Sequence, residues 1–171
     1  NAVSTRVAIP MLVNNLREPD NYGAYKSKST NIFANAKKQG YQTAFISAQG
    51  LEGLSNWIGI HDIDLWEDTQ IRPAPDVGAD VVLTPSVEKA TLDWNKPFLM
   101  VLNSRAPHIP YERNIPQGFA KFSTPRLSDD VAQKKNEYDD AVRLYDKELA
   151  SAIRTALAKS KLPVLVFITS D

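Results

Sequence analysis

The sequence contains no cysteine, and this absence excludes disulfide bonds and metal sites built from thiolates. It does not identify a compartment, because an oxidising environment permits disulfides without requiring them. No apolar run approaches the roughly 20 residues that a helix needs to cross a bilayer. Residues Asn1 to Pro10 also lack the charged and then apolar layout of a signal peptide.

An excess of charge of one sign is lacking too. The 20 Lys and Arg side chains are balanced by 20 Asp and Glu side chains, so the charge does not indicate binding to nucleic acid or to an anionic membrane. What is present is ordinary for a globular protein, with 43% hydrophobic and 23% charged residues. A chain of 171 residues corresponds to about one domain. We therefore treat residues 1–171 as a single domain.

Strand-like segments alternate along the chain with segments of helical periodicity. A parallel sheet covered by helices on both faces is typical of this alternation. We therefore expect an α/β fold with a mostly parallel sheet flanked by helices on both faces. The predicted strands are Tyr41–Ser47, Pro97–Asn103, Pro163–Thr169 and a short edge strand within Ile60–Trp66. The predicted helices are Thr5–Leu16 (shortened or bent at Pro10), a helix between Asn31 and Gly40, Val81–Leu92 after Pro85, and Asp129–Lys159.

Three of the predicted helices have a predicted buried face, and one of them also has predicted caps. Thr30 or Asn31 is expected to cap the second helix, and Gly40 stands where a glycine ends a helix. The buried faces are expected to be Ile32, Phe33 and Ala36 in the second helix, Val87, Ala90 and Leu92 in the third, and Tyr138, Val142, Tyr145, Leu149, Ile153 and Leu157 in the last.

The segment Pro163–Thr169 is the most strand-like run, and the sequence ends two residues after it. Ligands of open α/β sheets bind outside the carboxyl ends of the strands. We therefore expect residues 1–171 to be an incomplete part of a catalytic domain.

Three positions at the ends of predicted elements could carry chemistry. Ser4 and Thr5 are hydroxyls at the start of a helix, where they would serve as an N-cap or as a nucleophile stabilised by a metal. His108 follows a strand, beside Arg105, and is either a surface residue or a substrate contact. Asp171 directly follows a predicted strand, a common place for a metal ligand. A parallel sheet would bring these positions together.

The second histidine is interpreted differently. His61 lies in an alternating segment close to Asp62 and Asp64, and we favour a structural role for it.

Five motifs occur in the order and spacing of one family, and together they cover nearly the whole chain. The motifs are Ser4-Thr-Arg-Val-Ala-Ile-Pro10; Asn31-Ile-Phe33 with Gly40-Tyr-Gln-Thr-Ala-Phe-Ile-Ser-Ala-Gln49; Pro97-Phe-Leu-Met-Val-Leu102 with His108-Ile-Pro-Tyr111; Asn136-Glu-Tyr-Asp-Asp140 with Tyr145-Asp146; and Ile168-Thr-Ser-Asp171. With these motifs the sequence resembles the catalytic domain of bacterial phosphoethanolamine transferases, which belong to the alkaline phosphatase/sulfatase superfamily.

The resemblance implies an activity and roles for four residues. Thr5 matches the threonine that becomes phosphorylated, and Asp171 matches the Asp of a Ser-Asp-His-Gly-Glu motif whose Asp and His bind zinc. His108 matches a histidine near the substrate phosphate, and Gln49 falls at an Asn/Gln position that lines the site. Zinc or another divalent metal is the implied cofactor. It would lower the pKa of the threonine hydroxyl and offset charge on the phosphoryl oxygens.

The resemblance also implies partners and a location. Such enzymes are anchored in the bacterial inner membrane by an N-terminal region, and their catalytic domain lies at the periplasmic face of that membrane. They transfer phosphoethanolamine from phosphatidylethanolamine to lipopolysaccharide or another envelope glycan.

The sequence departs from the family at several positions. The family's first metal ligand, a Glu, would precede Asn1, and the His and Glu that follow Asp171 are missing. Gly53 stands where some relatives have a lysine. Many members that modify lipid A have disulfides, so the absence of cysteine leaves other glycan acceptors open. We expect these 171 residues to hold zinc weakly and to be inactive by themselves.

Two alternatives remain open. One is a sulfatase or phosphodiesterase of the same superfamily, although Ser4-Thr-Arg-Val-Ala8 does not match the Cys/Ser-x-Pro-x-Arg context of sulfatases. The other is a non-catalytic binding module with the same fold.

Overall fold

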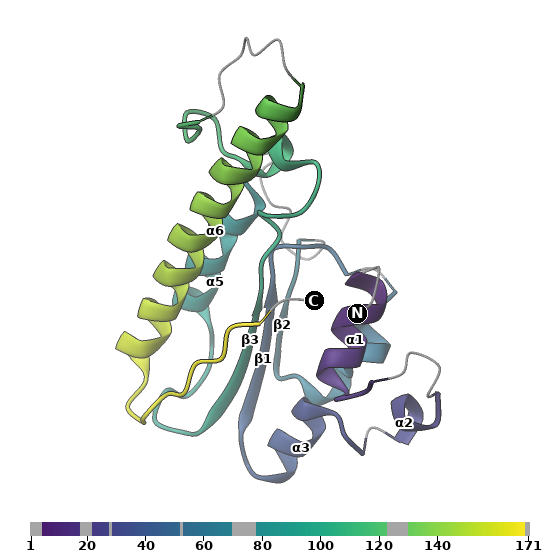
Figure 1. Cartoon of the computed structure of the whole chain (residues 1–171). Coiled ribbons are helices and arrows are strands. Elements are labelled where there is room, and N and C mark those ends of the chain that lie inside the picture. Colours follow the sequence, from purple (N-terminus) through teal and green to yellow (C-terminus); the bar gives the residue numbers. More distant parts are fainter. Residues whose placement is uncertain are drawn as a thin grey trace.

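The computed structural model describes residues 5–17, 22–27, 29–51, 53–69, 78–122 and 130–169. Within these ranges three parallel strands form one sheet in the order β2–β1–β3 (Figure 1). The central strand β1 (Gln42–Ser47) pairs with β2 (Leu65–Glu67) on one side and with β3 (Phe98–Asn103) on the other. The predicted α/β fold with a parallel sheet is confirmed, as are the strands predicted for β1 and β3.

Helices cover both faces of this sheet (Figure 1). None of the helices in the described ranges is long and apolar enough to cross a membrane. The helices are α1 (Thr5–Val13), α2 (Tyr22–Ser27), α3 (Ile32–Lys38), α4 (Ser55–Ile58), α5 (Leu83–Lys89) and α6 (Asp130–Lys159), and the 3-10 turns are η1 (Ile60–Asp62), η2 (Ala79–Val82) and η3 (Tyr111–Asn114).

One face of the sheet packs against α1 and α3. Phe45 of β1 is fully buried there together with Phe33 of α3 and Val13 of α1. The ring of Phe45 stacks on Trp66 of β2 with centroids 4.8 Å apart, and it meets Phe33 edge-on at 6.2 Å. Such aromatic pairs add about 0.5–1.5 kcal/mol each to the burial of their apolar area. This cluster therefore joins β2, β1 and α3.

The other face packs against α5 and α6. Ile46 points to this side, because successive side chains of a strand alternate between faces. It forms a buried cluster with Leu83 and Val87 of α5 and with Ala152 and Ala156 of α6. The small alanine side chains let α6 approach α5 and the sheet closely.

Two buried asparagines fix α1 relative to α3 and α4. The side-chain oxygen of Asn31 accepts hydrogen bonds from the backbone N–H groups of Phe33 (2.9 Å) and Ala34 (3.0 Å), which makes it the N-cap of α3. Its Nδ2 donates to Asn14 Oδ1 and to the carbonyl oxygen of Ile58, both at 3.0 Å. The cap predicted at Thr30 or Asn31 is thus Asn31.

Asn14 continues this network. Its Nδ2 donates to the carbonyl oxygens of Pro10 (2.8 Å), in α1, and Trp57 (2.7 Å), in α4. Gly59, the residue directly after α4, has a φ of 93°, and a Cβ there would lie 3.1 Å from Asn31 Nδ2. Glycine is required at that position both by the backbone conformation and by the space that Asn31 occupies.

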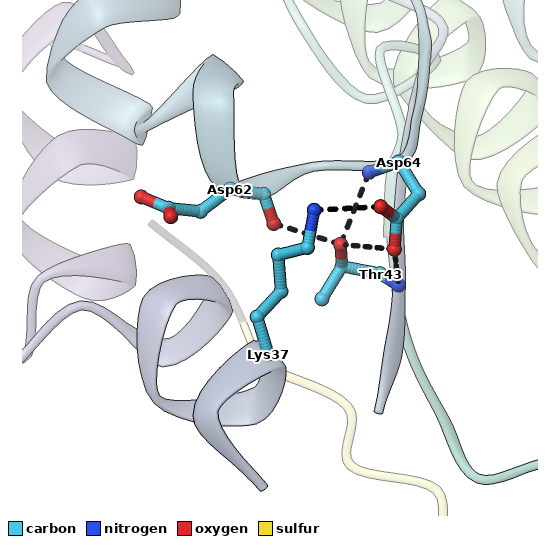
Figure 2. A network of polar contacts seen from close by, with 4 residues as sticks. All are labelled: Lys37, Thr43, Asp62 and Asp64. Carbon is cyan, nitrogen blue, oxygen red and sulfur yellow. Dashed lines mark hydrogen bonds and ion pairs between the residues drawn. The ribbon is translucent and has the colours of Figure 1, made fainter. Parts of the chain in front are cut away.

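A second polar network joins β1 to β2 at the amino end of the sheet (Figure 2). The Asp64 carboxylate accepts hydrogen bonds from Lys37 Nζ (2.7 Å) and from the backbone N–H of Thr43 (2.9 Å). The buried hydroxyl of Thr43 lies 2.7 Å from the carbonyl oxygen of Asp62 and 3.1 Å from Asp64 Oδ2. Burial raises the pKa of Asp64, but the hydrogen bonds from Lys37 and Thr43 outweigh it and hold that pKa below its usual value.

The face that α6 buries differs from the predicted one. Tyr138, Val142 and Leu157 of the predicted stripe are 38–45% exposed. The contact with α5 favours small side chains, so the helix is rotated by about one residue from the expected face. The side chains that α6 buries are Asp140, Ala141, Leu144, Glu148, Ala152 and Ala156.

The strand predicted over Pro163–Thr169 is wrong. This segment follows α6 without strand pairing, and Leu165, Phe167 and Ile168 are 78%, 83% and 69% exposed. A strand exists only where its backbone forms a ladder with a neighbour. β-branched composition indicates that preference, but it does not supply the partner.

Smaller differences concern where elements begin and what they bury. α5 begins at Leu83, before Pro85, because a proline in the first helical turn removes an N–H that needs no partner within the helix. The segment Ile60–Trp66 contains η1 before the edge strand β2. The side chains of β3 are half-buried throughout.

The two remaining predicted faces are nearly correct. Val87 of α5 is buried as expected, and Ala90 and Leu92 are buried too, but they follow the end of the helix at Lys89. In α3 the buried residues are Phe33 and Ala34, while Ile32 and Ala36 are half-buried.

Replacing Asn31 by alanine is expected to lower the free energy of unfolding by about 2–4 kcal/mol, because it removes an N-cap and leaves buried partners in α1 and α4 without their hydrogen bonds. Asn35→Ala on the exposed side of the same helix is the matched control and should cost well under half as much. Urea denaturation of the three proteins measures the difference, and equal losses would contradict the role given to Asn31.

Asp64 is expected to stabilise the fold at neutral pH and not at strongly acidic pH. A carboxyl whose pKa is lower in the folded state stabilises it above the unfolded pKa of about 4, and the contribution is lost as the pH falls through the folded pKa. Asp64→Asn should therefore cost up to about 1 kcal/mol at neutral pH, since the ion pair is partly exposed. In urea denaturation the difference in free energy of unfolding between wild type and Asp64→Asn should shrink as the pH falls below about 4. The control is Asp146→Asn, at an exposed position of α6. A difference in stability between wild type and Asp64→Asn that does not change with pH would contradict the role given to Asp64.

Candidate active site at the carboxyl edge of the sheet

The carboxyl ends of β1 and β3 lie side by side. Ser47 and Asn103, the last residues of these strands, are partners in the register, and the backbone N–H of Ala48 donates to the Asn103 carbonyl at 2.8 Å. In open α/β sheets, ligands bind outside this edge. The segments that leave the two strands carry Gln49 and His108, so the sheet brings these two predicted site residues to the same edge.

Ser47 and Asn103 organise the backbone at this edge. Asn103 Nδ2 donates to Ser47 Oγ at 2.9 Å, and Ser47 Oγ donates to the Gln49 carbonyl oxygen at 2.6 Å. The N–H of Gln49 in turn donates to Ser47 Oγ at 3.0 Å. Ser47 is 2% exposed, whereas Gln49 is half-buried. The Gln49 side chain is therefore carried by a short turn with a fixed backbone.

His108 lies on the loop between β3 and η3, and its side chain is exposed. Its backbone N–H donates to the Arg105 carbonyl oxygen at 2.9 Å, so His108 and Arg105 belong to one turn. The imidazole Nδ1 lies 2.5 Å from the Ile109 carbonyl oxygen. When Nδ1 carries the proton and donates to that carbonyl, Nε2 is left with its lone pair toward the surroundings.

Asp80 is a functional candidate that the sequence did not reveal. It belongs to η2, is fully buried, and accepts hydrogen bonds from the backbone N–H groups of Arg105 (2.7 Å) and Ala106 (3.1 Å) and from the hydroxyl of Ser104. Burial raises the pKa of the Asp80 carboxyl despite these hydrogen bonds, and the charge of Glu148 adds to the rise. No spacing pattern linked Asp80 to a loop some 25 residues away, so only the fold could identify it.

Thr5 is the first residue of α1, and its side chain lies outside the described part of the structure. Figure 1 shows the amino-terminal end of α1 turned toward the edge where β1 and β3 end. The opposite end of α1 is the one that Asn14 holds through its hydrogen bond to Pro10. The location of Thr5 on the backbone is compatible with the predicted site, and its role stays a prediction.

The remaining predicted residues fall elsewhere. Ser4 and Asp171 lie outside the described residues. His61 is exposed on η1, beside the network of Asp62 and Asp64 at the amino end of the sheet, which is the edge opposite Gln49 and His108. Gly53 lies two residues before the start of α4 and has a φ of 74°.

The described residues do not include three or more His, Cys, Asp or Glu side chains grouped so that they could hold a metal ion. The two ligands that the sequence predicts, the Thr5 hydroxyl and the Asp171 carboxylate, are not among the described side chains. The described part of the carboxyl edge therefore supplies a polar amide, an imidazole and backbone groups, and it does not by itself supply a metal centre.

Neither a curated protein nor a solved structure gives a significant match to the chain. A family model does: the one described as Sulfatase matches residues 2–171, which is all of the chain except its first residue. The three-stranded parallel sheet with helices on both faces agrees with that match. Enzymes of this kind are hydrolases and transferases that commonly use divalent metals. The chain belongs to the sulfatase family, within the superfamily of alkaline phosphatases and sulfatases.

Proposed function

We propose that the chain is part of a membrane-anchored, metal-dependent phosphoethanolamine transferase that forms a phosphothreonine intermediate at Thr5. The observation that carries the proposal is the residue context at the start of α1 in a sulfatase-family chain. Sulfatases use a Cys or Ser within Cys/Ser-x-Pro-x-Arg, whereas this chain has no cysteine and reads Ser4-Thr-Arg-Val-Ala8. A family member with a threonine at the head of this helix fits phosphoryl transfer better than sulfate ester hydrolysis.

The described residues at the carboxyl edge suit this chemistry. Phosphoryl transfer asks mainly for positioning and for stabilisation of charge on the equatorial oxygens. The exposed imidazole of His108 and the half-buried amide of Gln49 can both contact phosphoryl oxygens from segments that leave neighbouring strands. In the proposal His108 binds the phosphate of the substrate and Gln49 lines the site.

A covalent intermediate would let one site serve donor and acceptor in turn. The Thr5 oxygen would attack the phosphorus of phosphatidylethanolamine, the bond from phosphorus to the diacylglycerol oxygen would break, and that oxygen would take up a proton. The hydroxyl of an acceptor glycan would then displace Thr5. Zinc bound by Thr5 and Asp171 would lower the pKa of the threonine hydroxyl.

The partners and location belong to the same proposal. The donor would be phosphatidylethanolamine and the acceptor an envelope glycan, at the periplasmic face of the bacterial inner membrane. Balanced charge over the whole chain argues against nucleic acid as a partner.

A hydrolase of the same superfamily is the second candidate, and the family match itself favours it. A phosphodiesterase would use the same threonine and metal, with water as the acceptor. The two differ in where the phosphoethanolamine goes, so the products separate them.

The decisive measurement is mass spectrometry of the full-length protein after incubation with zinc and phosphatidylethanolamine vesicles and an acid quench. We expect a phosphoethanolamine adduct on Thr5 that disappears in Thr5→Ala and after removal of the metal by a chelator. Ser4→Ala is the matched control and should retain the adduct, because its hydroxyl is adjacent but outside the proposed chemistry.

The other outcomes are equally informative. An adduct on Ser4 would show that the nucleophile is the neighbouring residue. An adduct that decays to free phosphoethanolamine equally fast with or without glycan would identify a phosphodiesterase. If no adduct forms and the donor stays intact, the transferase proposal is wrong.

A further inference from the structure

The loop from Ser104 to Asn114 follows β3, contains His108 and ends with η3. Apart from η3 at its end, the loop has no regular secondary structure, so its backbone polar groups need partners from elsewhere. Ala106 within it is fully buried. A loop with such a buried centre keeps one conformation only when its N–H and C=O groups are satisfied.

Asp80 satisfies the first part of this loop. Its Oδ1 accepts from the N–H groups of both Arg105 and Ala106, and its Oδ2 accepts from the Ser104 hydroxyl. Three consecutive residues are thus held by one carboxylate that is fully buried. Charged acceptors form the stronger hydrogen bonds in proteins, and losing such an acceptor leaves two buried N–H groups without partners.

Asn114 holds the second part. It is 2% exposed, and its Nδ2 lies 2.6 Å from the His108 carbonyl oxygen. The carbonyl oxygens of Arg105, Ala106 and Pro110 surround the same nitrogen at 3.4 Å each. An amide nitrogen has two protons, so the short contact to His108 is the principal hydrogen bond and the others share the second proton.

The two side chains hold the backbone immediately before and at His108. The imidazole itself is exposed, and its Nδ1 contacts the carbonyl oxygen of the adjacent residue Ile109. The direction of the ring therefore depends on the backbone of the loop, and this backbone depends on Asp80 and Asn114.

We propose that Asp80 and Asn114 are positioning residues for His108 and hold its imidazole at the carboxyl edge of the sheet. The inference rests on the proposed function for the role of His108 toward a phosphate. The geometry of the loop is independent of that role, so the two ideas can fail separately.

The variant Asp80→Asn separates the positioning of the loop by residue 80 from the charge of its side chain. Its Oδ1 can still accept from Arg105 and Ala106, and its Nδ2 can donate to the Ser104 oxygen instead of accepting from it. It also avoids the cost of burying a carboxylate. Asp80→Asn should therefore preserve the loop, whereas Asp80→Ala should release it.

The first test is an NMR measurement on the 171-residue chain, which has only two histidines, His61 and His108. Long-range ¹H–¹⁵N correlation reports the tautomer of each ring, and hydrogen exchange reports the amides of Arg105 and Ala106. Asp80→Ala should speed exchange of these amides about tenfold or more, since each amide loses a hydrogen bond to a charged acceptor. Asp80→Ala and Asn114→Ala should both reduce the Nδ1–H tautomer of His108 and leave His61 unchanged.

Two control variants show which result would contradict the positioning role of Asp80. Thr43→Val removes a buried hydroxyl at the opposite edge and should destabilise the chain without altering His108. Asp80→Asn should resemble wild type. The proposal is overturned if Thr43→Val changes His108 as much as Asp80→Ala does, or if Asp80→Ala folds with wild-type tautomer and exchange. If Asp80→Ala does not fold, Ser104→Ala and Asn114→Ala provide the same comparison.

The second test is kinetic and uses the full-length protein. Displacement of His108 by the order of an ångström should slow formation of the Thr5 adduct about 100-fold in D80A, with D80N close to wild type. Because Asp80 acts through His108, the double variant D80A/H108A should be no slower than H108A. Fully additive losses would refute the positioning role. If the wild-type protein forms no adduct, the proposed function fails, and the NMR result alone decides whether the two residues position His108.

Discussion

The pairing of β1 on both of its edges is the constraint from which the rest of the structure follows. A central parallel strand needs a crossover on each side, and helices must then cover both faces of the sheet. Phe45 and Ile46, adjacent in β1, are buried in different clusters, one with α1 and α3 and the other with α5 and α6. The same pairing places the ends of β1 and β3 next to each other, so Gln49 and His108 share an edge although 58 positions separate their numbers.

Beyond the strands, buried side-chain amides and carboxylates replace the regular ladder. Asn31 satisfies the first turn of α3 while it connects α1 and α4, and Asp80 and Asn114 satisfy the loop after β3. An unpaired polar group in the interior costs about 1–3 kcal/mol, so each of these residues fixes a backbone conformation as well as a contact. Asp64 does the same for the start of β1, at a partly exposed position where its charge is easily kept.

The sequence predicted those parts of the fold that depend on local pattern. The apolar run around Phe45 and the polar residues ending the strands were enough to predict β1, β3 and the edge where ligands would bind. The face of α6 was missed, because burial there is decided by how closely its alanines approach α5 and not by the size of its apolar residues. The segment around Phe167 was missed because a strand requires a partner that composition does not reveal.

The candidate site likewise contains residues that the sequence predicted and one that only the fold revealed. His108 could be proposed because it follows a predicted strand, and Gln49 because the family resemblance places it in the site; both follow strands that end at the same edge of the sheet. Asp80 could not be proposed, since a buried aspartate within Gly78–Val82 resembles any surface acidic residue until the loop that it binds is known. The roles of Thr5 and Asp171 remain predictions from the resemblance, because their side chains lie outside the described residues.

The hydrogen bonds that fix α1 and the His108 loop suit a reaction that depends on precise alignment. α1, which begins with Thr5, is fixed at its far end through Asn14, while the His108 loop is fixed separately through Asp80 and Asn114. The amino-terminal end of α1 is turned toward the same edge of the sheet from which the His108 loop leaves β3 (Figure 1). In phosphoryl transfer the protein contributes mostly alignment and electrostatic stabilisation, and a misplacement of about 1 Å can cost about 100-fold in rate. Separate anchoring of the proposed nucleophile and of the proposed phosphate contact meets that requirement, because a substitution that loosens one anchor leaves the other in place.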